Sequence, residues 1–365
     1  MPLESIALTF VSNLGIRGAA YLLEQFGSAR AVYAASADEL RERGALREDI
    51  VRAIVSCKGM AEAERELAYC AKHGIKAVAA DSEEYPQLLR EANDFPAVLY
   101  VRGNVEALHQ RSVAFVGTRK ISSYGQRMCD KLVGEVGQVA PDAVVVSGLA
   151  FGVDGASHRA ALANGLKTVA VLANTLPSVN PAAHRALAED ILSSHGAIVS
   201  ELNSQTKQNG RLFISRNRII AALSAGTVIV ESPASGGSLS TAAFADGYNR
   251  AVMAVPGRVG DINSLGTNLL IRNRKAQLVL SGQDIASELM WDLEGSPVVS
   301  DAAEESGLSP EQESLLSLFD SDPLTIDTLL ERSGMSAGEL SLHLMNLEFA
   351  GLLHQLPGKA YEKSR

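Results

Sequence analysis

The chain has 365 residues, 46% of them hydrophobic, and a formal net charge of −9 at pH 7. This length exceeds one ordinary core and predicts two or three domains. No run of about 18 apolar residues occurs, and the start MPLESIALTF lacks the basic segment of a signal peptide. We therefore expect a cytoplasmic protein that does not bind membranes. The three cysteines lack metal-ligand spacing, so we expect reduced thiols and no bound metal.

Residues 1–73 are predicted to form a small helical domain. Apolar residues recur at helical spacing through VSNLGIRGAAYLLEQFGSARAVYAASADELRERG, and glycines interrupt them. This punctuation is typical of a helix-hairpin-helix or sterile-alpha-motif-like bundle. The turn LGIRG could bind DNA phosphates through its amides, but its acidic neighbours favour an architectural or partner-docking role.

Residues 74–285 are predicted to form an α/β domain. Lys76–Ala80 and Val98–Val101 have the pattern of strands that extend its sheet. Further on, SVAFVGTRK, AVVVSGLAFGVDGASHRAAL and TVIVESPASGG each run from a β-branched segment through a small-residue turn into a helix. This alternation predicts a doubly wound, extended Rossmann-like parallel sheet. No G-x-G-x-x-G follows the first strand, so an NAD site is not expected and no cofactor is predicted.

The turns after these strands are the candidate ligand site, because ligands of such sheets bind beyond the carboxyl ends of the strands. Glycines there allow close approach of the backbone, and helix N-termini favour phosphate. A second set of donors is predicted at the start of the helix that contains IIAALSAG, where one donor could instead brace the sheet. Tight turns demanded by the fold alone are the alternative for the glycines. The candidates are Gly117, Thr118, Arg119, Lys120, Ser147, Gly148, Arg216, Asn217, Arg218, Gly236, Gly237 and Ser238.

Charge is unevenly distributed along the chain. Residues 1–110 carry 12 Lys and Arg against 16 Asp and Glu, residues 111–281 carry 17 against 10, and residues 282–365 carry 4 against 16. The central segment is therefore basic while its neighbours are acidic. Basic side chains gathered on one face would provide the electrostatic footprint of a nucleic-acid site.

The C-terminal part is predicted to comprise an acidic linker, residues 286–309, and a winged-helix-like domain, residues 310–365. The linker repels itself and offers little apolar surface. The following segment has the pattern helix, turn, helix, turn, helix and two short strands, with Thr325 and Ser336 as helix caps. The helix over Ser336–Ala350 has no Lys or Arg, so contact with protein is favoured over DNA reading.

Six motifs occur in one order: VGTRK, SGLAFGVDGASH, SRNRIIAALS, GGSLSTA, AVPG and SLGTNLLI. In this order they resemble the DNA-processing protein A family (DprA, also called Smf), closely over about residues 75–281. The resemblance implies a non-enzymatic binder of single-stranded DNA that loads a RecA-type recombinase during natural transformation. It also implies a homodimer through the central domain.

The resemblance further implies that Arg119 and the segment Arg216–Arg218 lie beside the bound strand. Arg185 falls where the family often has a basic residue after a Tyr-Pro turn, although Asn180 replaces that Tyr here. Phe151 occupies a position where the family usually has Arg. It could stack on a base or pack under its loop.

Two enzyme readings are weaker. Ser147, Asp154 and His158 resemble triad ingredients, but no G-x-S-x-G elbow surrounds the serine. Nucleotide phosphoribohydrolases of the same type of fold need a Glu where this chain has Ala243. No catalytic residue is therefore predicted, and a small-nucleotide-binding sensor or a nucleotide phosphoribohydrolase-like protein on the same fold remains the alternative function.

Overall fold

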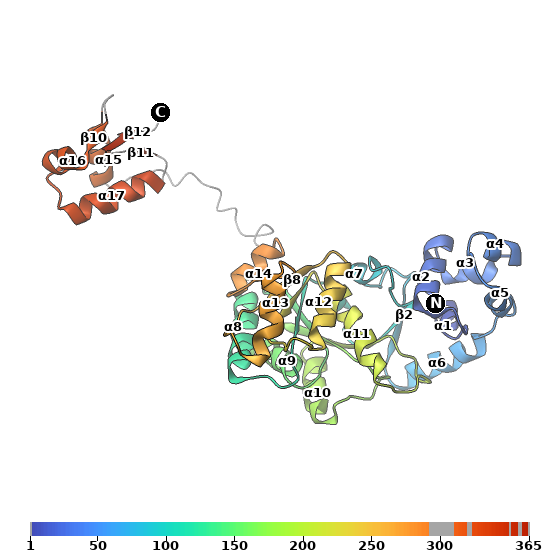
Figure 1. Ribbon diagram of the computed structural model, residues 1–365. Helices are drawn as coiled ribbons and strands as arrows, with labels where there is room; N and C mark the ends of the chain where they lie inside the picture. The colour runs from blue at the N-terminus through green and yellow to red at the C-terminus, as the bar shows by residue number, and fades with distance from the viewer. Residues whose placement is uncertain (1, 292–309, 320–322, 350–351, 357–359, 364–365) are drawn as a thin grey trace. The chain divides into compact units, whose positions relative to one another are not determined.

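The computed structural model describes residues 2–291, 310–319, 323–349, 352–356 and 360–363. The chain divides into two compact units, Met1–Glu294 and Gly295–Arg365 (Figure 1). Most of the predicted acidic linker, residues 292–309, lies outside the described residues. Within the described ranges, every helix is too short or too polar to cross a membrane.

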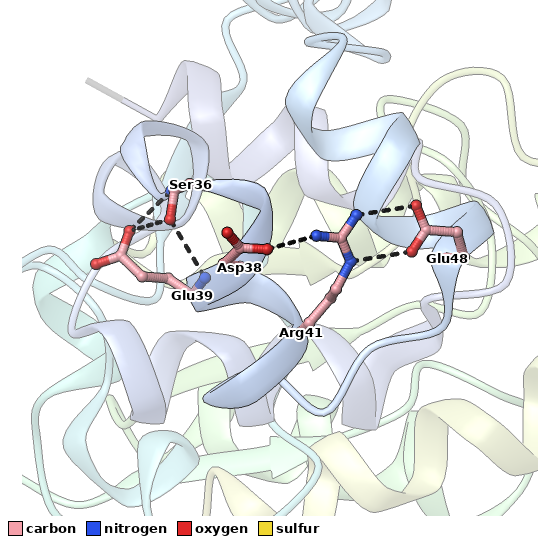
Figure 2. A network of polar contacts seen from close by, with 5 residues as sticks. All are labelled: Ser36, Asp38, Glu39, Arg41 and Glu48. Atoms are coloured by element: carbon pink, nitrogen blue, oxygen red, sulfur yellow. Dashed lines mark hydrogen bonds and ion pairs between the residues drawn. The ribbon is translucent and has the colours of Figure 1, made fainter.

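The first unit begins with short helices. They are α1 (Leu3–Thr9), α2 (Gly15–Phe26), α3 (Ala29–Ala34), α4 (Ala37–Glu42), α5 (Glu48–Val55) and α6 (Met60–Lys72). Ser36 and Glu39 form a capping box that starts α4, and Arg41 of the same helix bridges Asp38 and Glu48 of α5 (Figure 2). The ion pairs are exposed and contribute little, so the cap and the buried apolar faces define these helices.

A sheet with the strand order β1-β2-β6-β5-β4-β3-β7-β8-β9 forms the centre of this unit in the described residues. β2 pairs antiparallel with both β1 and β6, and the other pairs are parallel. This arrangement confirms the predicted doubly wound sheet and its extension by the segment before residue 104. The strands are β1 (Lys76–Ala79), β2 (Val98–Gly103), β3 (Ser112–Val116), β4 (Val144–Ser147), β5 (Lys167–Val171), β6 (Ala197–Ser200), β7 (Gly226–Ile229), β8 (Ala251–Ala254) and β9 (Gln277–Leu278).

Helices cover both faces of the sheet (Figure 1). Alternation along β3 determines which face each residue joins: Val113 and Phe115 pack with α8, α9 and α14, whereas Ala114 and Val116 pack with α11 and α12. Residues of α2, α3 and α5 belong to the second of these clusters, so the N-terminal helices share a core with the sheet. The helices are α7 (Gln87–Arg90), α8 (Ser123–Val139), α9 (Val153–Ala163), α10 (Arg185–Ser193), α11 (Arg211–Ala222), α12 (Ser238–Gly247), α13 (Leu265–Arg272) and α14 (Gly282–Glu288), with 3-10 turns η1 (Val105–Leu108), η2 (Ala182–His184) and η3 (Ile262–Ser264).

The second unit has the predicted winged-helix topology. Its helices are α15 (Pro310–Ser317), α16 (Ile326–Ser333) and α17 (Ala337–Phe349), and its sheet has the order β10-β12-β11. The strands are β10 (Leu324–Thr325), β11 (Leu353–Leu356) and β12 (Ala360–Lys363). Thr325 accepts from the Thr328 amide and Ser336 from the Glu339 amide, which confirms both predicted caps.

Candidate functional site

Three of the predicted turns meet at the carboxyl ends of the central strands. β4, β3 and β7 are adjacent and parallel, so the segments that follow them lie side by side. Thr118 joins the turns: its amide donates to the backbone carbonyl of Glu231 (2.8 Å), and its carbonyl accepts from the Val153 amide (3.1 Å). A cavity of about 250 Å³ opens at these strand ends, and its lining includes Gly117–Arg119, Asn217 and Gly236–Ser238.

Helix α11 begins earlier than the sequence predicted. The expected start was Arg216, but the helix runs from Arg211, and Asn209 Oδ1 accepts from the Arg211 amide (3.0 Å). Arg216 therefore lies in the second turn of α11, and its position owes nothing to a helix N-terminus. Residues 213, 216, 217 and 220 now share one helical face, and all four line the cavity.

Arg216 is a buried brace between two strand ends. Only 5% of it is exposed, and Nη1 donates to the carbonyls of Gly148 (2.6 Å) and Val171. Gly148 has to be glycine for this contact, because a Cβ there would lie 2.2 Å from Arg216 Nη1. Burial lowers the pKa of Arg216 and raises the pKa of the buried Asp154. The guanidinium thus lines the cavity while its Nη1 serves the protein backbone, and its buried Nε makes no hydrogen bond to the described residues.

Arg218 was predicted beside the ligand, and the structure gives it protein partners instead. It is 4% exposed, donates to the Asp94 carbonyl (2.6 Å) and pairs with the Glu201 carboxylate. A guanidinium that is desolvated and satisfied in this way is a structural tie. It therefore does not belong with the residues that can reach a ligand.

The residues of the Gly236–Ser238 turn differ in their surroundings. Gly237 is exposed, and a Cβ built there would meet nothing within 4 Å, so a ligand can approach its backbone. Ser238 is buried and donates to Ser232 Oγ (2.9 Å). Asn217 ties α11 to the start of α12 by donating to Ser240 Oγ (3.1 Å).

Arg119 and Lys120 are the exposed cations of the turn after β3. The Arg119 guanidinium lies over the ring of Phe213, 5.3 Å from its centroid. Such a cation–π contact holds the exposed Arg119 in the lining of the cavity. Arg119 is therefore an exposed cation in the cavity lining, as the predicted phosphate site requires.

Phe151 is half exposed, at 49%, and its ring meets the edge of His184 with centroids 5.0 Å apart. His184 in turn contacts the Leu149 carbonyl through Nδ1 (2.9 Å). Phe151 therefore packs against His184 while about half of the residue remains exposed. Arg185 begins α10 and is exposed, but it does not line this cavity.

Ser147 and His158, two of the three triad candidates, are buried and make structural hydrogen bonds. Ser147 is fully buried and its hydroxyl donates to the Phe115 carbonyl (2.6 Å). His158 contacts Thr168 Oγ1 through Nδ1 (2.7 Å), and burial lowers its pKa to about 3. Neither group makes the nucleophile–base hydrogen bond that a triad requires.

Two residues that frame the site were not singled out from the sequence. Phe213 lines the cavity and supports Arg119. Helical spacing would have revealed it once the start of α11 was placed at Arg211. Glu231, read as the end of a strand, is buried and accepts from the amide (2.9 Å) and hydroxyl (2.5 Å) of Ser122, the N-cap of α8. No local signal distinguishes that carboxylate.

Comparisons with known proteins agree with this architecture. Residues 76–290 match the family model described as DNA recombination-mediator protein A, and residues 299–359 match the DprA winged helix domain. Protein Smf of Escherichia coli is 35% identical over 306 residues, covering 81% of this chain and 79% of that protein. DNA processing protein DprA of Bacillus subtilis is 36% identical over 226 residues, covering 62% and 75%.

Solved structures similar to this one include those of two DNA processing proteins. The DNA processing protein A of Streptococcus pneumoniae is 30% identical, with a TM-score of 0.66, and covers 79% of this chain and 98% of that chain. The DNA processing protein A of Helicobacter pylori, studied for its single-stranded DNA binding mode, is 28% identical with a TM-score of 0.53 and covers 60% and 97%.

Proposed function

This chain belongs to the DNA recombination-mediator protein A family (DprA/Smf), and from that premise we propose that it binds single-stranded DNA at the cavity beyond β3, β4 and β7. The observation that carries the proposal is the pairing of an exposed arginine with an aromatic ring at a cavity rimmed by glycine turns. Guanidinium and backbone amides suit phosphates, and the ring suits an unstacked base.

Each part of the site has a proposed role. Arg119 and Lys120 neutralise phosphates of the strand, and Thr118 and the Gly237 amide position them. Phe213 and the half-exposed Phe151 offer faces for bases. Gly117, Gly148 and Gly236 keep the turns compact, and Arg216 braces two of the strand ends. Arg185 is kept as a peripheral phosphate contact because it is exposed at the start of α10.

The DNA-bound protein would deliver a RecA-type recombinase to the strand. The description of the family as a recombination mediator supports this role. The sequence adds no further support, because surfaces that bind partners carry no motif. The measurement is the lag before a recombinase hydrolyses ATP on single-stranded DNA coated with a single-strand-binding protein. A lag that this protein does not shorten would contradict the role.

We further propose a homodimer through the central domain, which would extend one short groove across two subunits. Exposed apolar side chains near the edge strand β9, Leu278 and Leu280, support this proposal. Light scattering at micromolar concentration without DNA should give twice the chain mass. A monomeric mass would count against the dimer.

The winged-helix unit is proposed to contact protein. α17 presents the exposed apolar residues Leu342 and Met345 and contains no Lys or Arg. A helix that reads the major groove ordinarily brings basic side chains to the phosphates. Deleting this unit should therefore leave affinity for DNA largely unchanged.

The test of the function is fluorescence anisotropy of a labelled oligo-dT strand and a matched duplex across a salt series. We expect tighter, salt-sensitive binding of the single strand, weakened in Arg119→Ala. Arg65→Ala is the matched control, because Arg65 is exposed on α6 and outside the cavity lining. Absence of a single-strand preference would refute the proposal and favour the small-nucleotide alternative, which a nucleotide competition assay would then examine.

A further inference from the structure

Two loops frame the part of the proposed DNA groove that lies beyond Phe213. This residue lines three cavities of about 250, 170 and 430 Å³, which together form the groove. The loop over residues 172–181, which follows β5, contributes Asn180 to the second and third cavities. The loop over residues 201–210, which follows β6, contributes Asn209 to the third cavity and leads into α11, which carries Phe213. The positions of the two loops therefore determine the shape of the groove.

One side of helix α6 bonds to both loops. The Tyr69 hydroxyl donates to the carbonyl of Leu176 (2.9 Å), in the loop after β5. The Glu66 carboxylate accepts from the amide (2.9 Å) and the hydroxyl (2.5 Å) of Ser204, in the loop after β6. Glu66 and Tyr69 are three residues apart in α6, so their side chains lie on the same side of the helix. A single helix of the N-terminal domain thus holds both walls of the groove.

The contacts between α6 and the loops are buried. Glu66 is 1% exposed, and a carboxylate removed from water needs the two donors that Ser204 supplies. Leu176 belongs to the same apolar cluster as Ala63 of α6 and Leu149 of the turn after β4. Packing therefore places the helix against the loops, and the hydrogen bonds fix the position of each loop along it.

The two loops are also tied to each other. The Ser200 hydroxyl donates to the carbonyl of Asn174 (2.9 Å), and the Leu202 amide donates to Ser200 Oγ (3.2 Å). A displacement of either loop therefore strains the other. Because a ligand site that is only partly in its binding conformation has a proportionally lower apparent affinity, the position of these loops affects binding in the groove as a whole.

We propose that α6 is a clamp that positions both loops for the DNA strand, with Glu66 and Tyr69 as its positioning residues. The inference rests on the proposed single-stranded DNA binding. Both residues lie outside the linings of the three cavities, so they act through the loops and not by touching DNA. α6 also precedes residues 76–290, the segment that matches the family model. The clamp therefore gives the helical domain of this chain a role at the groove.

The experiment releases the clamp and leaves the cavity linings intact. Wild type and a Tyr69→Phe/Ser204→Ala double variant are titrated with a labelled 15-nucleotide oligo-dT by anisotropy. One hydrogen bond corresponds to about 2- to 10-fold in an equilibrium, so we expect the double variant to bind about 5-fold or more weakly. Tyr69→Phe/Ser204→Thr, which keeps the second hydroxyl, should recover part of this loss. Tyr33→Phe is the matched control and should bind as wild type does, because the Tyr33 hydroxyl donates to the Lys58 carbonyl (3.3 Å) within the helical domain.

Hydrogen exchange followed by mass spectrometry measures the release of the loops directly. Amides of residues 172–181 and 201–210 should exchange faster in the double variant, whereas those of α8 should exchange as in wild type. Unchanged exchange in both loops would overturn the clamp. Faster exchange with unchanged affinity for oligo-dT would overturn its role in DNA binding. Failure of wild type to bind oligo-dT at low salt would instead overturn the DNA-binding function, and the exchange rates would still test the clamp.

Discussion

Replacement of Arg216 by alanine should destabilise the central domain, although sequence reasoning placed this residue among the DNA contacts. The guanidinium is 5% exposed and bonds two backbone carbonyls at the ends of β4 and β5. Alanine would leave both carbonyls buried without that donor. It would also remove the cation that favours the charged form of the buried Asp154.

The size of the effect follows from these contacts. A buried polar group that loses its partner costs about 1–3 kcal/mol, and Arg216→Ala would affect two such carbonyls and also remove the cation near the buried Asp154. The contributions overlap, so we expect a loss of about 3–5 kcal/mol for Arg216→Ala. Arg119→Ala should change the free energy of unfolding by no more than about 0.5 kcal/mol, because Arg119 is exposed.

Urea unfolding followed by Trp291 fluorescence measures this difference. Trp291 is the one tryptophan of the chain, and it is buried in the same cluster as Phe115 and Val145, next to the affected strands. With an m-value of about 1–3 kcal/mol/M, the midpoint of Arg216→Ala should fall by at least about 1 M. An unchanged midpoint together with lost DNA binding would refute the brace and return Arg216 to the ligand contacts.

Three further outcomes are expected. Burial lowers the folded pKa of His158 to about 3, below its unfolded value, so the stability present above about pH 6.5 is lost as the pH falls, at about 1.4 kcal/mol per pH unit. His158→Gln should remove this part of the acid sensitivity, and urea midpoints that change with pH in parallel for wild type and variant would contradict it. Glu66, 1% exposed on α6, accepts from the Ser204 amide (2.9 Å) and hydroxyl (2.5 Å), so Glu66→Gln should lower stability by about 1–3 kcal/mol, a reading that an unchanged urea midpoint would rule out. Phe213→Ala should weaken binding of single-stranded DNA by about 1–3 kcal/mol at an unchanged salt slope, with Phe213→Trp retaining affinity; a reduced slope would assign the loss to phosphates instead.

The sheet was predictable from the sequence because its determinants are local. Runs of β-branched residues, each ending in a small-residue turn, specify both the strands and the edge at which β3, β4 and β7 present their turns. The start of α11 was missed because Gly210 directly precedes it, and because Phe213, Ile214 and Ser215 are weaker helix formers than the Ala-containing segment after Arg218. The buried roles of the arginines depend on partners far along the chain. Asp94 is 124 residues from Arg218, and Gly148 is 68 residues from Arg216.

The excess of basic residues in the central segment therefore overstates the cations that DNA can reach. Arg216 and Arg218 are buried with protein partners, which leaves Arg119 and Lys120 as the exposed cations of the turn at the groove. Each neutralised phosphate of a single strand contributes about −0.7 to the slope of log K against log salt. For an oligonucleotide that fills one groove, Arg119, Lys120 and the peripheral Arg185 predict a slope of about −2.1, whereas the addition of Arg216 and Arg218 would predict about −3.5. A slope near the larger value, reduced by about 0.7 in the neutral variant Arg216→Gln, would mean that the buried guanidinium meets a phosphate, and the brace would then be only the state of the protein without DNA.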